Sequence, residues 1–398
     1  MHENLKTAVV AAALSAATAG CASAPESARA TGPGWLAISA NDNKVVLING
    51  VSTVVKNPQP DTLALVDLAQ SPPRLIAEID IPAATVLGPP ATVAVTPDER
   101  LALIGSGVKI NPADPTKQID DNRVTLVDLK ANPPRVLGTV EAGAQPTGIS
   151  VTPDGKLALV ANRAEGTVSV FSINGNTLTK TGTIKIGDAK SGTSHVVVTP
   201  DGKTALVTRD GDHFISVLSI DNGVVEYSKR DISAGIRPYG ITMNPNGSNA
   251  IVANIGRGAG DADSVSVIDL RSKPYRVVNT VSVGQTPEGI MYSPDGRYLA
   301  VVAMNGSNKA KESPFYTDAG KLVVYRVDGI QLSALAEAPI GHWSQGAAFS
   351  ADSRTILVQN MVEKDLWVFA FDGSSLKDTG QRIKLRAGAG AIRTAGVR

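Results

Sequence analysis

The chain has little of the residues on which several classes of protein depend. Its 398 residues include one cysteine, 4% aromatic residues and 19% charged residues, with 38 Lys and Arg against 37 Asp and Glu. A single cysteine excludes an intrachain disulfide, a CxxC redox pair and a cysteine metal site. A formal net charge of +1 without runs of like charge gives no surface suited to nucleic acid. After the N-terminal segment no run of 18 apolar residues occurs, so we expect no membrane-spanning helix.

The N-terminus is typical of a secreted protein. Residues 7–19 form an apolar run that is too short to span a bilayer but matches the core of a secretory signal. Small residues then precede Cys21, which resembles a bacterial lipoprotein signal, although Thr18 stands where that family usually has Leu. The resemblance implies a signal peptide over 1–20, lipidation of Cys21 and a flexible tether over 21–33. Ordinary cleavage and secretion without a lipid is the alternative. We expect a location in the bacterial cell envelope, periplasmic-facing or at the outer membrane, with membrane contact only through the lipid.

One turn motif recurs along the rest of the chain. Thr-Pro-Asp-Gly-Lys occurs at 152–156 and 199–203, and variants of it occur at 96–99, 244–247, 293–297 and 350–353, with a degenerate copy at 39–42. Proline fixes φ for a tight turn and glycine tolerates a left-handed conformation, so each copy indicates a hairpin turn. Successive copies lie 45 to 57 residues apart.

Each interval between turns holds four short strands by composition and period, and helical periodicity is absent. Seven such units predict an all-β fold, a seven-bladed β-propeller of four-stranded antiparallel blades over 34–386. Residues 387–398 are left as a C-terminal tail. Within that tail 392–397 (IRTAGV) copies 236–241 (IRPYGI), so we expect the tail to close the ring beside the first blade.

The repeat P-x-G-I-x-x-x-P-D-G-K-x-A-x-V-x-N at 146–171, with copies beginning at 238 and 287, resembles the YVTN-family β-propeller repeat of bacterial envelope and surface proteins. The tetrad that names the family is degenerate here, as LVAN, IVAN and LVQN. More distantly the arrangement is similar to the lactonase-family propellers. Such a resemblance implies the fold firmly and the function only loosely.

The two faces of such a propeller differ in sequence. The tight turns join the first and second strands of each blade and all fall on one face, here called the turn face, which we interpret as structural. The long inserts join second and third strands and fall on the opposite, loop-rich face; they are 50–61, 105–121, 255–263 and 305–320. Long loops on a rigid scaffold usually carry binding, so we expect a partner protein or small ligand on the loop-rich face.

Polar residues at the starts of strands and in loops of that face are the candidate ligand-binding residues. They are Arg163, Arg209, His213, Arg237, Tyr239, Arg257, Glu288 and His342. His195 opens an innermost strand in a context that resembles the His-containing strand of lactonase propellers, which implies a general base acting on water. No HExxH, G-x-S-x-G or Walker motif occurs, and we expect no cofactor and no metal.

These patterns favour a non-catalytic binding or scaffold propeller of the envelope. The alternative is an enzyme, a lactone hydrolase similar to 6-phosphogluconolactonase, with His195 as its catalytic residue at the mouth of the channel.

Overall fold

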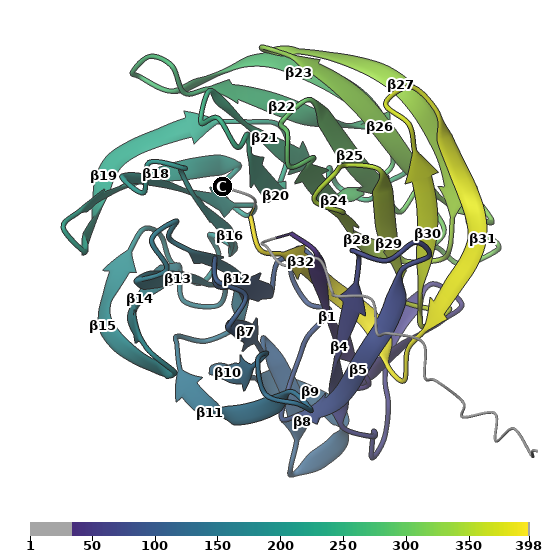
Figure 1. Cartoon of the computed structure of the whole chain (residues 1–398), viewed down its shortest axis with the longest axis horizontal. Helices are drawn as coiled ribbons and strands as arrows, with labels where there is room; N and C mark the ends of the chain where they lie inside the picture. Colours follow the sequence, from purple (N-terminus) through teal and green to yellow (C-terminus); the bar gives the residue numbers. More distant parts are fainter. Residues whose placement is uncertain (1–33, 397–398) are drawn as a thin grey trace, which may run out of the picture.

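The computed structural model describes residues 34–396, which form strands and connections without a helix. Seven four-stranded antiparallel sheets stand around a central axis (Figure 1). This arrangement confirms the predicted all-β, seven-bladed propeller. In the described part of the chain no helix is long and apolar enough to cross a membrane.

Blades 1 to 3 each place one strand at the axis and run outward from it. Blade 1 contains β32 (Gly388–Thr394), β1 (Leu36–Asp42), β4 (Asp61–Asp67) and β5 (Arg74–Ile81). Blade 2 contains β6 (Val93–Val95), β7 (Leu101–Gly105), β10 (Arg123–Asp128) and β11 (Arg135–Glu141). Blade 3 contains β12 (Pro146–Val151), β13 (Leu157–Asn162), β14 (Thr167–Asn174) and β15 (Thr177–Lys185).

Blades 4 to 7 have the same strand order. Blade 4 contains β16 (Thr193–Val198), β17 (Thr204–Arg209), β18 (Phe214–Asp221) and β19 (Val224–Ser233). Blade 5 contains β20 (Pro238–Met243), β21 (Asn249–Asn254), β22 (Asp263–Asp269) and β23 (Arg276–Gly284). Blade 6 contains β24 (Pro287–Tyr292), β25 (Tyr298–Ala303), β26 (Gly320–Asp328) and β27 (Gln331–Ile340). Blade 7 contains β28 (Ser344–Phe349), β29 (Thr355–Asn360), β30 (Asp365–Phe371) and β31 (Leu376–Lys384).

The C-terminal segment completes the first blade. β32 lies beside the axis and pairs antiparallel with β1, from Ala37 opposite Thr394 to Asp42 opposite Gly388 (Figure 1). The domain boundary expected at residue 386 therefore falls within the ring. The degenerate turn predicted at 39–42 is wrong, because these residues belong to β1. Blade 1 needs no such turn, since its innermost strand comes from the other end of the chain.

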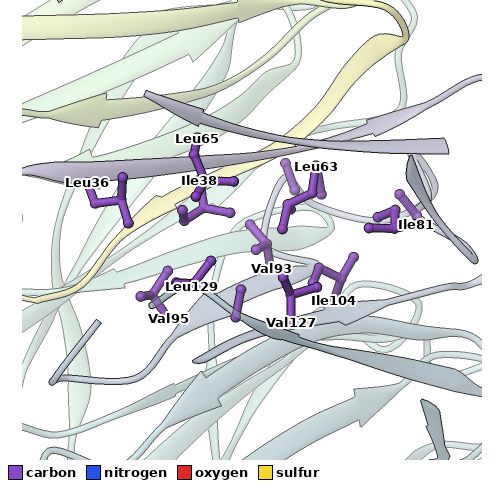
Figure 2. Close-up of a cluster of buried hydrophobic side chains, with 14 of the residues drawn as sticks. Leu36, Ile38, Leu63, Leu65, Ile81, Val93, Val95, Ile104, Val127 and Leu129 are labelled. Carbon is purple, nitrogen blue, oxygen red and sulfur yellow. The ribbon is translucent and has the colours of Figure 1, made fainter. Parts of the chain in front are cut away.

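The hydrophobic core lies between blades, because a single sheet exposes both of its faces. Figure 2 shows one such interface, where Ile38 and Leu63 of blade 1 face Val93, Ile104 and Val127 of blade 2. Similar clusters of buried aliphatic side chains fill the other interfaces. The innermost strands of neighbouring blades contact each other around the whole ring.

The inserts form a linked group on the loop-rich face. Blade 1 adds the hairpin β2 (Val45–Ile48) and β3 (Val51–Val54), and blade 2 adds β8 (Val108–Asn111) and β9 (Asp114–Asp120). β3 contacts β9. At the hairpin tip the Lys311 amide donates to Asn49 Oδ1 at 3.2 Å, which joins blade 1 to the blade 6 insert. Lys309 Nζ then donates to the Gly258 carbonyl of the blade 5 insert at 2.6 Å.

Candidate functional site

The innermost strands carry a β-bulge near their start in blades 3 to 7. The register against the second strand shifts after Pro146, Thr193, Pro238, Pro287 and Ser344. A bulge turns a side chain away from the regular alternation of a strand. The residues at the second strand position are Thr147, Ser194, Tyr239, Glu288 and Gln345.

The third position of these strands is glycine in four of the five blades. A Cβ on Gly148 would come 2.6 Å from the Cα of His195, and one on Gly240 would come 2.8 Å from the Glu288 carbonyl oxygen. Glycine therefore allows neighbouring innermost strands to approach closely. Blade 4 is the exception, because His195 occupies this position.

Four of the predicted residues meet around a carboxylate that the sequence analysis did not select. Arg163 pairs with Asp210 through both terminal nitrogens, and Arg237 Nη2 lies 3.2 Å from Asp210 Oδ2. The Arg163 guanidinium also stacks 5.7 Å from the centre of the Tyr239 ring. Glu288 faces the same group. These five residues are called the Asp210 cluster below.

Burial dominates the electrostatics of the cluster. Glu288 is 6% exposed, and burial raises its pKa to about 8 although Arg237 and Arg163 oppose the shift. Burial also works against ionisation of Asp210, but its hydrogen bonds with Arg163 keep its pKa below the usual value. Near neutral pH the cluster thus holds two guanidinium groups, one carboxylate and one carboxyl that is mostly protonated.

His195 lies between blades 3 and 5. Its Nδ1 accepts a hydrogen bond from the Ile241 amide at 3.0 Å, which places the ring proton of the neutral imidazole on Nε2. Burial, and then the nearby Arg393 guanidinium, hold the pKa of His195 well below its usual value. The neutral imidazole therefore has Nε2–H as its remaining polar group, which is a hydrogen-bond donor, whereas the predicted role as general base needs a free nitrogen lone pair.

An axial cavity of about 850 Å³ opens on the turn face, opposite the face where binding was expected. His195 and Arg393 line it, together with mainly apolar side chains. Five prolines of the recurring turns line its outer part and are called the proline collar; they are Pro97, Pro153, Pro200, Pro245 and Pro294. None of the residues at the second strand position in blades 3 to 7 is among the described residues that line this cavity.

Arg393 was not predicted as a site residue. Its Nη1 donates to the carbonyl oxygens of Pro90 at 3.0 Å and Ile392 at 2.8 Å, and within residues 34–396 no carboxylate forms an ion pair with it. Burial lowers the pKa of Arg393 to about 10, so the guanidinium stays charged at neutral pH. Arg393 is half-buried, and withdrawing a cation from water without an acidic partner among residues 34–396 is costly, so an anion in the cavity would offset that cost.

The loop-rich end of the channel is filled by residues 82–91, here called the channel connection. Thr85 lies beside Gly390 of β32, Gly88 beside Thr147 of β12, and Pro90 beside Gly346 of β28. Because these strands belong to blades 1, 3 and 7, the connection runs inside the ring. The cavity therefore ends at the level of His195 and Arg393.

A buried ion group anchors the channel connection. Lys44, which is 6% exposed, pairs with Asp42 and Asp61 and donates to the Ala84 carbonyl at 2.8 Å. The carboxylates in turn accept hydrogen bonds from the amides of Val86 at 3.0 Å and Ala84 at 2.8 Å.

The remaining predicted residues lie apart from the channel. Arg209 is held by Asp212 and Asp231, and the exposed His213 accepts the Arg237 amide on Nδ1 at 3.1 Å. Arg257 is exposed on the blade 5 insert.

His342 also stands outside the Asp210 cluster, between two acids. Its Nδ1 lies 2.7 Å from Glu363 Oε1 and its Nε2 lies 3.3 Å from Asp318 Oδ1. Burial works against the imidazolium, but Glu363 and Asp318 outweigh it and raise the pKa of His342. Among the described residues no group of three His, Cys, Asp or Glu is arranged to hold a metal ion.

The fold and site define a class, the seven-bladed β-propeller with an axial cavity closed at one end. No known family model matches the chain, and no curated protein matches it either. Solved structures of three proteins are similar in fold. The periplasmic gluconolactonase of Pseudomonas aeruginosa is 18% identical with a TM-score of 0.64, over 91% of this chain and 100% of that one. A Bacteroides fragilis protein provisionally named 6-phosphogluconolactonase is 17% identical with a TM-score of 0.69, over 91% and 98%. A Desulfotomaculum acetoxidans protein of unknown function is 15% identical with a TM-score of 0.67, over 91% and 99%.

Proposed function

We propose that this protein is a binding propeller that holds a small organic anion in its axial cavity and carries out no chemistry of its own. The observation that supports this most is the Arg393 guanidinium, which lines the cavity and has no acidic partner among residues 34–396. His195 Nε2–H adds a second, neutral donor at the same depth. A pocket of this volume, largely apolar with a few placed polar groups, is typical of small-molecule sites.

Binding of a panel of carboxylates and phosphate monoesters to residues 27–398 tests this proposal. Thermal shift and calorimetry would compare the wild type with Arg393→Met, which keeps the side-chain bulk but removes the charge. Arg354→Met is the matched control, because Arg354 is exposed on the same face. We expect at least one anion to bind the wild type and the control about 10- to 100-fold more tightly than Arg393→Met, the usual range for hydrogen bonds to a charged group. Equal binding to all three proteins would contradict the proposal.

A lactone hydrolase is the second candidate. It is favoured by Glu288, a buried carboxyl between the guanidinium groups of Arg237 and Arg163, and by the names of two of the similar structures. In this mechanism ionised Glu288 takes a proton from the attacking water, and the guanidinium groups stabilise the oxyanion that forms on the lactone carbonyl.

Turnover of sugar lactones, phosphorylated ones included, tests the hydrolase. Removing a general base lowers a rate by about 10² to 10⁴. Activity lost to that extent in Glu288→Gln supports the hydrolase with Glu288 as base. Activity that is lost in His195→Ala but kept in Glu288→Gln would make His195 the general base. A folded protein without turnover would contradict the hydrolase and leave the binding propeller as the proposed function.

We also propose that the protein is a YVTN-type lipoprotein of the cell envelope, with a partner protein on its loop-rich face. The signal, Cys21 and the tether lie outside the described residues. The first described residue, Gly34, is held on the turn face, where its amide donates to Glu99 Oε1 at 3.1 Å. A lipid on Cys21 would therefore connect the membrane to the propeller at its turn face. Membrane fractionation of the full chain against Cys21→Ser tests the anchor, and an unchanged distribution would contradict it.

A further inference from the structure

The cavity combines a charged inner end with an apolar wall and an apolar mouth. This inference rests on the proposed function, because it names the class of ligand for the same site. We infer that the ligand is an amphipathic monoanion, whose carboxylate head binds Arg393 and His195 and whose apolar body lies along the wall and leaves through the proline collar.

The inner end selects the head group by its hydrogen-bonding capacity. Arg393 has only donors, and among residues 34–396 only its Nη1 is used, by the carbonyl oxygens of Pro90 and Ile392. His195 Nδ1 already accepts the Ile241 amide, so Nε2–H is the group of this lining residue that remains to donate to a ligand. Two donor groups fit a group that only accepts hydrogen bonds, as an ionised carboxylate does. One positive charge at this depth matches one negative charge.

The only acid that lines the cavity, within the part of the chain described, is at its rim. Asp154 Oδ1 accepts Thr152 Oγ1 at 2.6 Å and the Lys156 amide at 3.0 Å. Its carboxylate is thus used within its own turn, and it does not neutralise Arg393.

The wall favours an apolar body over a polyhydroxy one. The apolar side chains of the lining include Val95, Val151, Val197, Ile241, Met243 and Met291. Hydroxyls of Ser150 and Thr242 also line the cavity, but they already accept the amides of Val198 at 3.2 Å and Tyr292 at 3.5 Å. Methionine side chains are unbranched and adapt to ligands of different shape. A sugar acid would leave most of this surface without a polar partner and would lose hydrogen bonds to water on entry.

The recurring turn explains why the mouth is apolar. In four turns of the collar the first residue, Thr or Ser, donates its hydroxyl to the aspartate of the same turn at 2.5 to 2.6 Å. In the fifth, Asn244 Oδ1 accepts the Asn246 amide at 3.0 Å. The glycine of one turn packs on the proline of the turn before it, as Gly155 does on Pro97 and Gly202 on Pro153. Polar groups of the turns are therefore satisfied locally, while the prolines line the opening.

Calorimetry with straight-chain carboxylates from butanoate to dodecanoate, below their micelle concentrations, tests the inference on residues 27–398. Each buried methylene contributes a transfer free energy that corresponds to about a fourfold gain in affinity. We expect the affinity to rise by about this factor per methylene until the chain passes the collar. Arg393→Met should weaken every member by a similar factor, and Met243→Gln, which keeps volume but adds polarity, should weaken only the longer ones.

The outcomes separate this inference from the proposed function. Binding that needs Arg393 but does not change with chain length overturns the amphipathic ligand and leaves the anion site intact. Carboxylates that bind equally to the wild type and Arg393→Met, or not at all, overturn the anion site itself. If dodecyltrimethylammonium or dodecanol binds as tightly as dodecanoate, the ligand does not need an anionic head. If Met243→Gln leaves the affinity for dodecanoate unchanged, the alkyl chain does not lie along this wall.

Discussion

The Asp210 cluster makes the stability of the propeller depend on pH through one residue. Glu288 has a pKa of about 8 in the folded protein, against an ordinary value of 4.5. Between these two values the folded state holds a proton that the unfolded state has lost. Stability must therefore fall as the pH rises through this window, and Glu288→Gln, which keeps shape but cannot ionise, must remove that part of the fall.

The size of the effect follows from the shift. One pKa unit corresponds to 1.36 kcal/mol, and between pH 5 and pH 7.5 the folded state holds on average about 0.9 more protons at this site. The contribution of Glu288 to the free energy of unfolding should thus decrease by about 3 kcal/mol across this range. The charged neighbours of Glu288 are Arg163, Arg237 and Asp210. The raised pKa of Arg163 and the lowered pKa of Asp210 keep both of these groups charged from pH 5 to 7.5.

Melting temperatures of the wild type and Glu288→Gln, measured in half-unit steps from pH 5 to 8.5, provide the assay. The difference between variant and wild type should move in favour of the variant by several degrees as the pH rises. Glu226→Gln is the matched control, because Glu226 is exposed on β19. Parallel curves for the wild type and Glu288→Gln would refute the reasoning.

Three further predictions concern stability. Deleting the residues after Leu385 removes β32 and should destabilise the fold by roughly 5 kcal/mol or more, because a whole inner strand is lost. The melting temperature should fall strongly, whereas removing 397–398 alone should leave it unchanged. An unchanged midpoint for the longer deletion would contradict closure of the ring by β32. Lys44→Met leaves two buried carboxylates without their cation and should lower the free energy of unfolding, measured in urea, by about 3–5 kcal/mol. Lys56→Met is the control and should leave the free energy of unfolding nearly unchanged. His342 has a raised pKa, so its acidic partners add stability that is fully present below about pH 6.5 and is lost as the pH rises through the folded value. The stability gap between wild type and His342→Gln should therefore close on the alkaline side, and a gap that is constant with pH would contradict the ion pair.

The fold was predictable because each repeated turn and strand has a recognisable local sequence pattern. The turns at 152–156 and 199–203 mark where strands begin and end. Seven such units are compatible with few architectures other than a ring. Blade 1 was less clear, because the partner of β1 is β32 from the opposite end of the chain and no local pattern encodes that pairing. The copy of 236–241 within 392–397 pointed to the tail, but its register is different: Arg237 precedes β20, whereas Arg393 is the sixth residue of β32.

The site was predictable only in part, and for physical reasons. Tyr239 and Glu288 occupy the same position of neighbouring blades, and Arg163 and Arg237 lie at strand ends on the same face, so their convergence follows from the ring. The cavity could not be predicted in this way, because it depends on the channel connection filling the other end of the channel. The turn prolines were interpreted through backbone geometry alone, while their shared position at the mouth appears only when the blades are assembled. The sequence did contain one usable signal, since His195 replaces a glycine of the repeat.

Arg393 is proposed to hold the head of an organic anion inside the axial cavity. A crystal of the protein soaked with 8-bromooctanoate tests it directly, because the bromine is located by its anomalous signal. We expect the carboxylate on Arg393 and His195 and a bromine peak toward the proline collar. Bromine sites only on the outer surface, with the cavity free of the ligand at saturating concentration, would contradict it.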